Sequence, residues 1–176
     1  VANADKSKIT RKELKELAIE LFKDDSEVAL FYFSGHGYIE NTGSYLITSE
    51  CSYGDDGLPL NELLEIANVS PARNKIIVLD CCHAGYVGKK SGGDKESTLS
   101  EGLTILTASS EDQYAMEENG SGVFTTLLVD ALNGSASNLV GDITPGSVYA
   151  HIDQSLGPWE QRPLFKTNVK TFISLR

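Results

Sequence analysis

The chain has 176 residues, a length that fits one ordinary globular domain. Its hydrophobic content of 40% is enough for a packed core and argues against a disordered tail. With 15 Lys and Arg against 25 Asp and Glu, the formal net charge is −10. This balance disfavours general binding to nucleic acid and suits a basic ligand or peptide better.

Cellular location is constrained only weakly by the sequence. No apolar run approaches the roughly 18 residues that a membrane span needs, so we expect no membrane insertion. The chain opens VANADKSKIT, with neither Met nor an apolar leader, and we interpret it as a fragment or a processed product. Three cysteines, two of them adjacent, cannot form a disulfide framework, which favours a reducing, cytoplasmic location.

Helices and strands are expected to alternate along the chain. Thr10 and Glu13 have the spacing of a capping box, and apolar residues follow at helical intervals. The run 27–33 is short, β-branched and aromatic, which is typical of an interior strand, and 75–79 is the clearest buried strand. The other expected elements are a strand at 44–47, a helix at 60–67, a strand at 103–108, helices at 122–132 and 145–156, and an edge strand within 164–175.

This alternation predicts an α/β fold with a mostly parallel sheet covered by helices on both faces. We find no internal repeat and expect a single domain over 1–176. The segment 86–101 is polar and contains glycine, which indicates an exposed loop. In parallel sheets, ligands and chemistry gather at the carboxyl ends of the strands.

Two polar motifs directly follow the two strongest strands. Ser34-Gly35-His36-Gly37 follows the first, and Asp80-Cys81-Cys82-His83-Ala84-Gly85 follows the second. Both motifs should therefore lie on one rim, where an imidazole could take a proton from a thiol that attacks a carbonyl carbon. Taken singly, such a histidine is more often structural and a buried cysteine is usually inert. It is their conjunction that indicates a cysteine–histidine site.

These two motifs, with Phe31-Tyr32-Phe33 before the first and Val78-Leu79 before the second, resemble the active-site motifs of the caspase-like cysteine proteases. The similarity is closer to metacaspases and their bacterial relatives than to animal caspases. The cysteine lies 46 residues after the histidine, and the caspase spacing is about 50. The resemblance continues through 106–113, Gly122-Val123-Phe124-Thr125 and Gln161-Arg162-Pro163, so it covers nearly the whole chain.

The resemblance implies a function and a set of roles. His36 would be the general base and acid, and Cys82 the nucleophile of a cysteine endopeptidase that forms an acyl-enzyme. Cys81 would fill the small-residue position before the nucleophile. The N–H groups of Gly37 and Cys82 would form the oxyanion hole. His83 adjoins the nucleophile, but successive residues of an extended chain point to opposite faces, so we interpret it as structural.

The resemblance also implies a preference for Arg or Lys before the scissile bond. Asp80 would line the pocket as the acid does in metacaspases, with Ser34 as a second wall and Asp112 as a further acceptor. A carboxylate there would pair with a guanidinium and reject an acidic side chain. The alternatives are a strand-end cap for Asp80 and a solvated loop residue for Asp112.

Activation is also suggested by the resemblance, because caspase-like proteins often carry an activation cleavage site in the equivalent loop. Lys89, Lys90 and Lys95 make 86–101 a candidate self-substrate.

We expect no cofactor and no metal ligands. Metacaspases often need calcium, but the carboxylates of Glu50, Asp55, Asp56, Glu117 and Glu118 lack EF-hand spacing, so a calcium site is the weaker alternative. The cysteines and histidines lack zinc-ligand spacing. His151 and Trp159 are expected to be packing residues.

The implied fold is a caspase-like three-layer sandwich. Such a fold normally begins with a βαβ unit that is not found upstream of Val1, so we expect a missing N-terminal segment or additional domains of the same protein. Two rival functions remain: a gated or inactive sensing module of a bacterial defence or signalling system, and another cysteine hydrolase or transferase that uses the same dyad. The expected partner is a protein or peptide substrate with a basic residue, and neither nucleic acid nor membrane.

Overall fold

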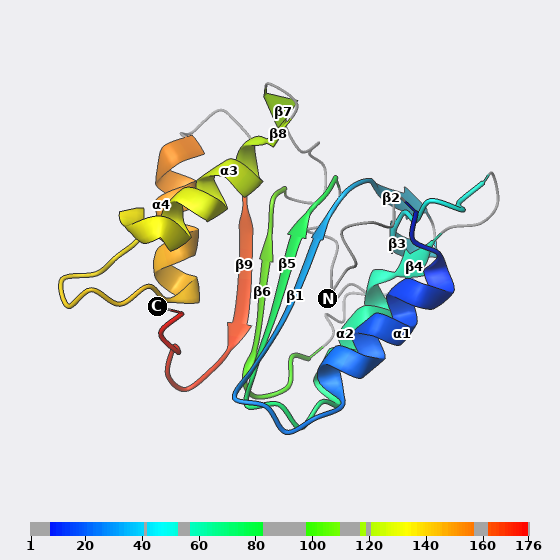
Figure 1. Ribbon diagram of the computed structural model, residues 1–176, viewed down its shortest axis with the longest axis horizontal. Helices are drawn as coiled ribbons and strands as arrows, with labels where there is room; N and C mark the ends of the chain where they lie inside the picture. The colour runs from blue at the N-terminus through cyan, green and yellow to red at the C-terminus, as the bar shows by residue number, and fades with distance from the viewer. Residues whose placement is uncertain are drawn as a thin grey trace.

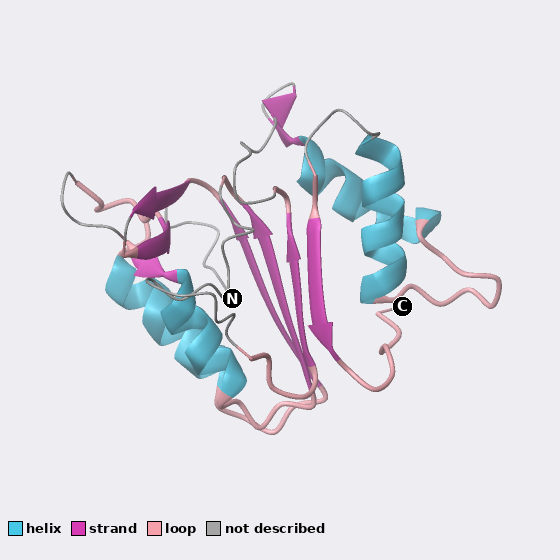
Figure 2. Ribbon diagram, turned by 180° about the vertical axis from the view of Figure 1, so that it is seen from behind, coloured by secondary structure: helices cyan, strands magenta, loops and turns pink. Residues whose placement is uncertain are grey.

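The computed structural model describes residues 8–40, 42–52, 57–82, 98–109, 117–118, 121–156 and 162–175. Three layers are visible in Figures 1 and 2: a central sheet with a pair of helices packed on each face. The three-layer α/β fold predicted from the alternation of helices and strands is confirmed. None of the helices in these ranges is long and apolar enough to cross a membrane.

The central sheet has four strands in the order β1-β5-β6-β9. The first three strands are parallel, and β9 pairs antiparallel with β6. In Figure 1 the carboxyl ends of β1, β5 and β6 lie together at the top of the sheet. The strands are β1 (Val28–Ser34), β5 (Asn74–Asp80), β6 (Leu103–Thr107) and β9 (Leu164–Asn168).

β1 lies at an edge of this sheet, with β5 as its neighbour among the described strands. We predicted an interior strand from its apolar, aromatic sequence; among the described strands β5 is its one hydrogen-bonded neighbour, so an interior position stays a prediction. Val28, Leu30 and Tyr32 are exposed on it, whereas Ala29 and Phe31 are buried. The apolar run therefore reflects one buried face and one open face, which hydropathy alone does not separate from two buried faces.

One face of the sheet is covered by α1 (Arg11–Phe22) and α2 (Leu60–Asn68) (Figure 1). The predicted capping box is present: Thr10 Oγ1 accepts from the Glu13 N–H at 3.2 Å, and a Glu13 carboxylate oxygen accepts from the Thr10 N–H at 3.0 Å. Apolar side chains of both helices pack against the face of β5 and β6 that lies on their side of the sheet. The core on this side includes Leu14, Ala18, Phe22, Leu63, Leu64, Ile77, Leu79, Cys81, Leu103 and Ile105.

The other face is covered by α3 (Val123–Asp130), which continues into the π-helical turn η2 (Ala131–Ser135), and by α4 (Pro145–Leu156). This layer encloses a second core, which includes Ile76, Val78, Leu106, Phe124, Leu128, Val148 and Ile152. Successive β5 residues thus alternate between the two cores, as expected for a strand buried on both faces. The side chain of the last β5 residue, Asp80, belongs by this alternation to the α3 face.

Two small sheets flank the carboxyl ends of the central strands. The first, in the order β2-β3-β4, contains β2 (Gly37–Glu40), β3 (Gly43–Leu46) and β4 (Leu58–Pro59). The second pairs β7 (Glu117–Glu118) with β8 (Ser121–Gly122) directly before α3. Of these strands the sequence patterns predicted only β3, placed at 44–47 where the structure has Gly43–Leu46. β4, β7 and β8 have two residues each, which is too few to show a period.

Candidate active site

β1 and β5 end side by side at one rim of the sheet. Ser34 lies opposite Asp80 in the parallel register, and the Gly35 N–H donates to the Asp80 carbonyl at 3.1 Å. The residues that follow each strand, His36 on one and Cys82 on the other, therefore leave the sheet from neighbouring positions. The prediction that the two motifs lie on one rim of the sheet depended on this parallel pairing.

His36 occupies the single residue between Gly35 and the start of β2. Its side chain is exposed, and its backbone carbonyl accepts from the Ile47 N–H at 2.9 Å. The pairing of β2 with β3 thus fixes the backbone of His36, while the imidazole remains accessible from solvent.

Gly37 lies directly against the backbone of Cys82. A Cβ atom built on Gly37 would be 2.1 Å from the carbonyl oxygen of Cys82 and 3.3 Å from the Cys81 Sγ. No real side chain tolerates the first distance, so only glycine allows the two chain segments to approach this closely. The residue after His36 is therefore in contact with Cys82.

The amide of Gly37 points away from β3. In an antiparallel ladder, hydrogen-bonded and non-hydrogen-bonded pairs alternate. The bond from Ile47 to His36 makes that pair a bonded one, so the next pair, Gly37 with Leu46, is a non-bonded one. Because β2 is the outer strand of its sheet, the Gly37 N–H faces away from the β2–β3 ladder.

The two adjacent cysteines differ sharply in environment. Cys81 is 1% exposed and belongs to the core beneath α1 and α2, whereas Cys82 is partly exposed. Burial, with smaller contributions from the negative charges of Cys82 and Asp80, raises the pKa of the Cys81 thiol to about 12. Cys81 is consequently a protonated, inert thiol near neutral pH.

A buried serine that follows the neighbouring strand β6 supports the backbone of the cysteine pair. The Ser109 hydroxyl donates to the Cys81 carbonyl at 3.1 Å, and the Thr107 hydroxyl donates to the Ser109 carbonyl at 3.0 Å. Ser109 and Thr107 are both fully buried. Sequence reasoning assigned them no role, because a hydroxyl after a strand carries no distinctive signal.

Asp80 is buried on the α3 face, with 5% of its surface exposed. Its Oδ2 accepts a hydrogen bond from the Thr125 hydroxyl and faces the Cα of Gly122, where a Cβ would lie 2.5 Å away. Ser34, its neighbour in the register, is exposed. The structure thus brings Asp80 and Ser34 together and adds Thr125, a residue that the sequence comparison included in a motif without giving it a task.

Several predicted residues lie outside the described ranges. These are Asp112, Lys89, Lys90, Lys95, His83, Asp55, Asp56 and Trp159, together with 86–97 of the predicted loop. His151 is described, and its Nε2 pairs with Asp130 Oδ2 at 3.0 Å between α4 and α3.

Among the described side chains, no group of three or more His, Cys, Asp or Glu residues could hold a metal ion. Of the five carboxylates weighed for calcium, only Glu50 has a described side chain, and its Oε1 accepts from the Arg11 N–H at 2.7 Å. The calcium alternative otherwise falls on residues outside the described ranges.

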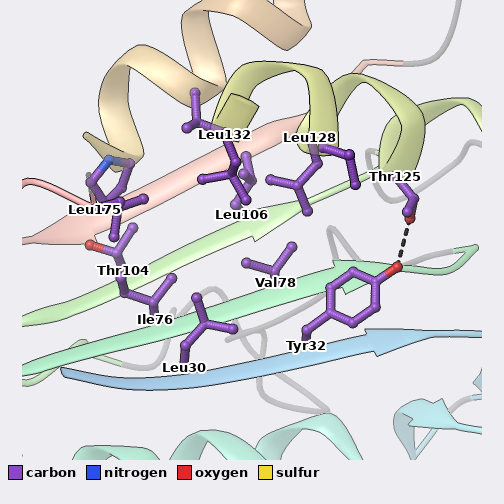
Figure 3. Close-up of a pocket in the computed structure, with 13 residues that line it drawn as sticks. Leu30, Tyr32, Ile76, Val78, Thr104, Leu106, Thr125, Leu128, Leu132 and Leu175 are labelled. Carbon is purple, nitrogen blue, oxygen red and sulfur yellow. Dashed lines mark hydrogen bonds between the residues drawn. The ribbon is translucent and has the colours of Figure 1, made fainter. Parts of the chain in front are cut away.

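An apolar pocket of about 310 Å³ opens on the α3 face of the sheet (Figure 3). Its lining comes from β1, β5, β6, α3, η2 and α4, with Leu175 near the C-terminus, and it includes Tyr32 and Thr125 at one end but not His36, Cys82 or Asp80. It is therefore distinct from the rim that carries the cysteine and the histidine.

The sheet order, the helical layers and the rim bearing a histidine and a cysteine after neighbouring parallel strands define a caspase-like α/β domain. Comparison with known families agrees: the Caspase domain model, of peptidase family C14, matches residues 2–172. The chain belongs to this family, and the membership supports a cysteine-type peptidase.

Solved structures support the fold. The crystal structure of protein GSU0716 from Geobacter sulfurreducens matches with a TM-score of 0.61 at 17% sequence identity, over 92% of this chain and 74% of that chain. At this identity the likeness bears on the fold alone. A search of curated proteins found no match.

Proposed function

We propose that this domain is a cysteine endopeptidase that cleaves peptide bonds after Arg or Lys, with Cys82 as nucleophile and His36 as general base and acid. The observation that carries the proposal is the contact between Gly37 and the Cys82 backbone, where a Cβ would lie 2.1 Å from the carbonyl oxygen. It brings the segment bearing an exposed imidazole against the segment bearing a partly exposed thiol. Such proximity is the first requirement of a thiol–imidazole pair.

The proposed reaction proceeds through a covalent intermediate. His36 takes the thiol proton of Cys82, and the sulfur attacks the scissile carbonyl carbon to form a tetrahedral oxyanion. Collapse of this intermediate breaks the C–N bond, and the leaving amine receives the proton from His36. Water, deprotonated by His36, then attacks the thioester, which releases the carboxylic acid and returns the proton to sulfur.

The N–H groups of Gly37 and Cys82 would stabilise the oxyanion. The direction of the Gly37 amide, away from the β2–β3 ladder, supports this assignment. Preorganised amide donors of this kind are worth about 2.7–4 kcal/mol each in the transition state. Cys81 is a poor candidate for the nucleophile, since burial raises the pKa of its thiol to about 12.

The preference for a basic side chain rests on Asp80, with Ser34 beside it and Asp112 as a further acceptor. Asp80 is the acid at the rim next to the nucleophile, and a guanidinium or ammonium would pair with it. The net charge of −10 gives the whole domain a field that attracts basic peptides. The proposed partner is a protein or peptide with a basic residue before the scissile bond. The proposed location is a reducing, cytoplasmic compartment, as the small number of cysteines favours.

Cleavage of the domain's own loop 86–101 at Lys89, Lys90 or Lys95 is part of the same proposal. Incubation of active enzyme followed by mass spectrometry should find new termini after these lysines, and Cys82→Ala should show none. An intact loop in a preparation that cleaves Arg peptides would contradict self-processing.

A gated or inactive sensing module is the second candidate, and one observation favours it. With 5% of its surface exposed and a hydrogen bond from Thr125, Asp80 is closed to solvent. A substrate side chain would therefore have to enter a buried site, as expected for a domain that needs an activating signal. The third candidate is another cysteine hydrolase or transferase that uses the same cysteine–histidine dyad.

Fluorogenic peptides ending in Arg, Lys or Asp distinguish these candidates. The proposal predicts turnover of Arg and Lys peptides, none of Asp peptides, loss of activity in Cys82→Ala and retention in Cys81→Ala. Absence of turnover with every peptide would favour the sensing module. Turnover after Asp would refute the assignment of Asp80, and activity surviving Cys82→Ala would refute the assignment of the nucleophile.

A further inference from the structure

Three hydroxyl and carboxyl groups form a chain of hydrogen bonds at the top of the α3 face. The Tyr32 hydroxyl of β1 lies 2.7 Å from the Thr125 Oγ1 of α3 (Figure 3), and the Thr125 hydroxyl donates to Asp80 Oδ2 at the end of β5. A threonine hydroxyl has one proton, and Asp80 receives it. Tyr32 must therefore donate to Thr125, so both O–H groups point along the chain toward the carboxylate.

The start of α3 is built around the same carboxylate. Gly122 is the N-cap of the helix and offers no side-chain capping bond, while Thr125 lies in its first turn. The Cα of Gly122 is so close to Asp80 that an added Cβ would lie 2.5 Å from Oδ2. An anion at this position is favoured by the partial positive charge of a helix N-terminus. The first turn of α3 therefore contacts Asp80 in two ways: Gly122 leaves space for the carboxylate, and Thr125 donates a hydrogen bond to it.

We propose that Thr125 is a positioning residue for substrate specificity: its hydroxyl orients the Asp80 carboxylate that receives the Arg or Lys side chain of the substrate. Tyr32 acts one step further out by fixing the Thr125 rotamer. This inference rests on the proposed function, because it assigns Asp80 to the basic side chain. It adds Tyr32 of β1 and Thr125 of α3 to the residues proposed to recognise the basic side chain of the substrate.

A purely structural role for Thr125 makes a different prediction. If the hydroxyl only satisfied a buried carboxylate, its removal would weaken turnover of charged and neutral substrates alike. If it orients Asp80 for a cation, the loss should fall on basic substrates. A comparison of peptides ending in Arg with peptides ending in citrulline, its neutral isostere, separates the two roles.

The chain offers well-matched variants. Thr125→Val replaces the hydroxyl by a methyl group of similar size and removes the donor to Asp80 while keeping the branched side chain. Thr125→Ser keeps the donor and serves as the rescue. Tyr32→Phe removes the outer donor and leaves the ring in place. Thermal denaturation of each variant establishes that it is folded.

We expect Thr125→Val to lower kcat/KM for the Arg peptide about tenfold or more, mainly through KM, because hydrogen bonds to charged groups are among the stronger ones. The citrulline peptide should lose far less, Thr125→Ser should recover most of the loss, and Tyr32→Phe should show a smaller change in the same direction. Equal losses for the two peptides, or a loss confined to kcat, would overturn the proposal.

Binding of benzamidine, a small cation that mimics an Arg side chain, is measured in parallel by calorimetry. Wild-type protein that binds benzamidine without cleaving any Arg peptide would refute the proposed function, and weaker binding by Thr125→Val would still support the positioning role. Equal binding by the two proteins would overturn the positioning role alone. Wild-type protein that neither cleaves nor binds would overturn both.

Discussion

Replacing Gly37 by alanine tests the contact that brings the histidine and cysteine segments together. The added Cβ would lie 2.1 Å from the Cys82 carbonyl oxygen, and real Cβ atoms essentially never approach a heavy atom within 3.0 Å. Because the atom it meets is backbone, no side-chain rotation relieves the overlap. The two segments must therefore move apart by at least about 0.9 Å.

A displacement of that size falls on the reacting groups. A misplacement of about 1 Å can cost about 100-fold in rate, which corresponds to about 2.7 kcal/mol of transition-state stabilisation. We therefore expect Gly37→Ala to lower kcat/KM on an Arg peptide about 100-fold. The overpacking itself should reduce the free energy of unfolding by about 1–3 kcal/mol, measured by urea denaturation.

Gly35→Ala is the matched control, since it adds the same methyl group on the other side of His36. Its Cβ would meet only the tip of the Phe33 ring, at 3.0 Å, and a side chain can give way. We expect most of the activity to remain. If Gly37→Ala retained near-wild-type activity, or if Gly35→Ala lost as much, the contact between Gly37 and Cys82 would not be what aligns the pair.

Two further predictions concern the support of the site. Burial raises the pKa of the Cys81 thiol from its ordinary value of 9.0 to about 12, so the folded state holds a proton there that the unfolded chain loses first. The contribution of this thiol to the free energy of unfolding is complete below about pH 9 and declines as pH rises toward 12, by roughly 1 kcal/mol between pH 9 and 10. Urea denaturation at several pH values should show that Cys81→Ala flattens this decline. An unchanged slope in that variant would contradict the prediction. Ser109→Ala should lose about 1 kcal/mol of stability and also lower kcat, because its hydroxyl holds the Cys81 carbonyl at 3.1 Å. Thr10→Ala, at the capping box of α1, is the control: it should lose a similar amount of stability, about 1 kcal/mol, with no change in kcat. Equal effects of Ser109→Ala and Thr10→Ala on kcat would refute the support assigned to Ser109.

The order of the main elements could be predicted from the sequence because their patterns are local. The capping box at Thr10 and Glu13, the apolar run of β5 and the proline at the start of α4 each correspond to an element in the structure. Adjacent parallel strands also place the residues that follow them on one rim, so the approach of the His36 and Cys82 segments follows from topology.

What could not be predicted depends on distant contacts. The open face of β1 depends on the packing of the whole molecule, since β1 and β5 have similarly apolar sequences but alternate side chains of β1 are exposed while those of β5 are buried. The bond between Thr125 and Asp80 joins residues 45 apart, and nothing in either local pattern specifies it. Gly37 and Gly122 look like ordinary loop glycines until a backbone or carboxylate atom is found against each Cα.

Covalent labelling with a peptidyl arginyl chloromethyl ketone, with the modified residue mapped by mass spectrometry, tests the central assignment most directly. Alkylation by this reagent needs a nucleophilic sulfur, a nearby base and a pocket for a basic side chain together. We expect one label, on Cys82, that is lost in His36→Ala and slowed by free benzamidine. A label on Cys81, or labelling of Cys82 that is unchanged in His36→Ala, would contradict the proposed pair.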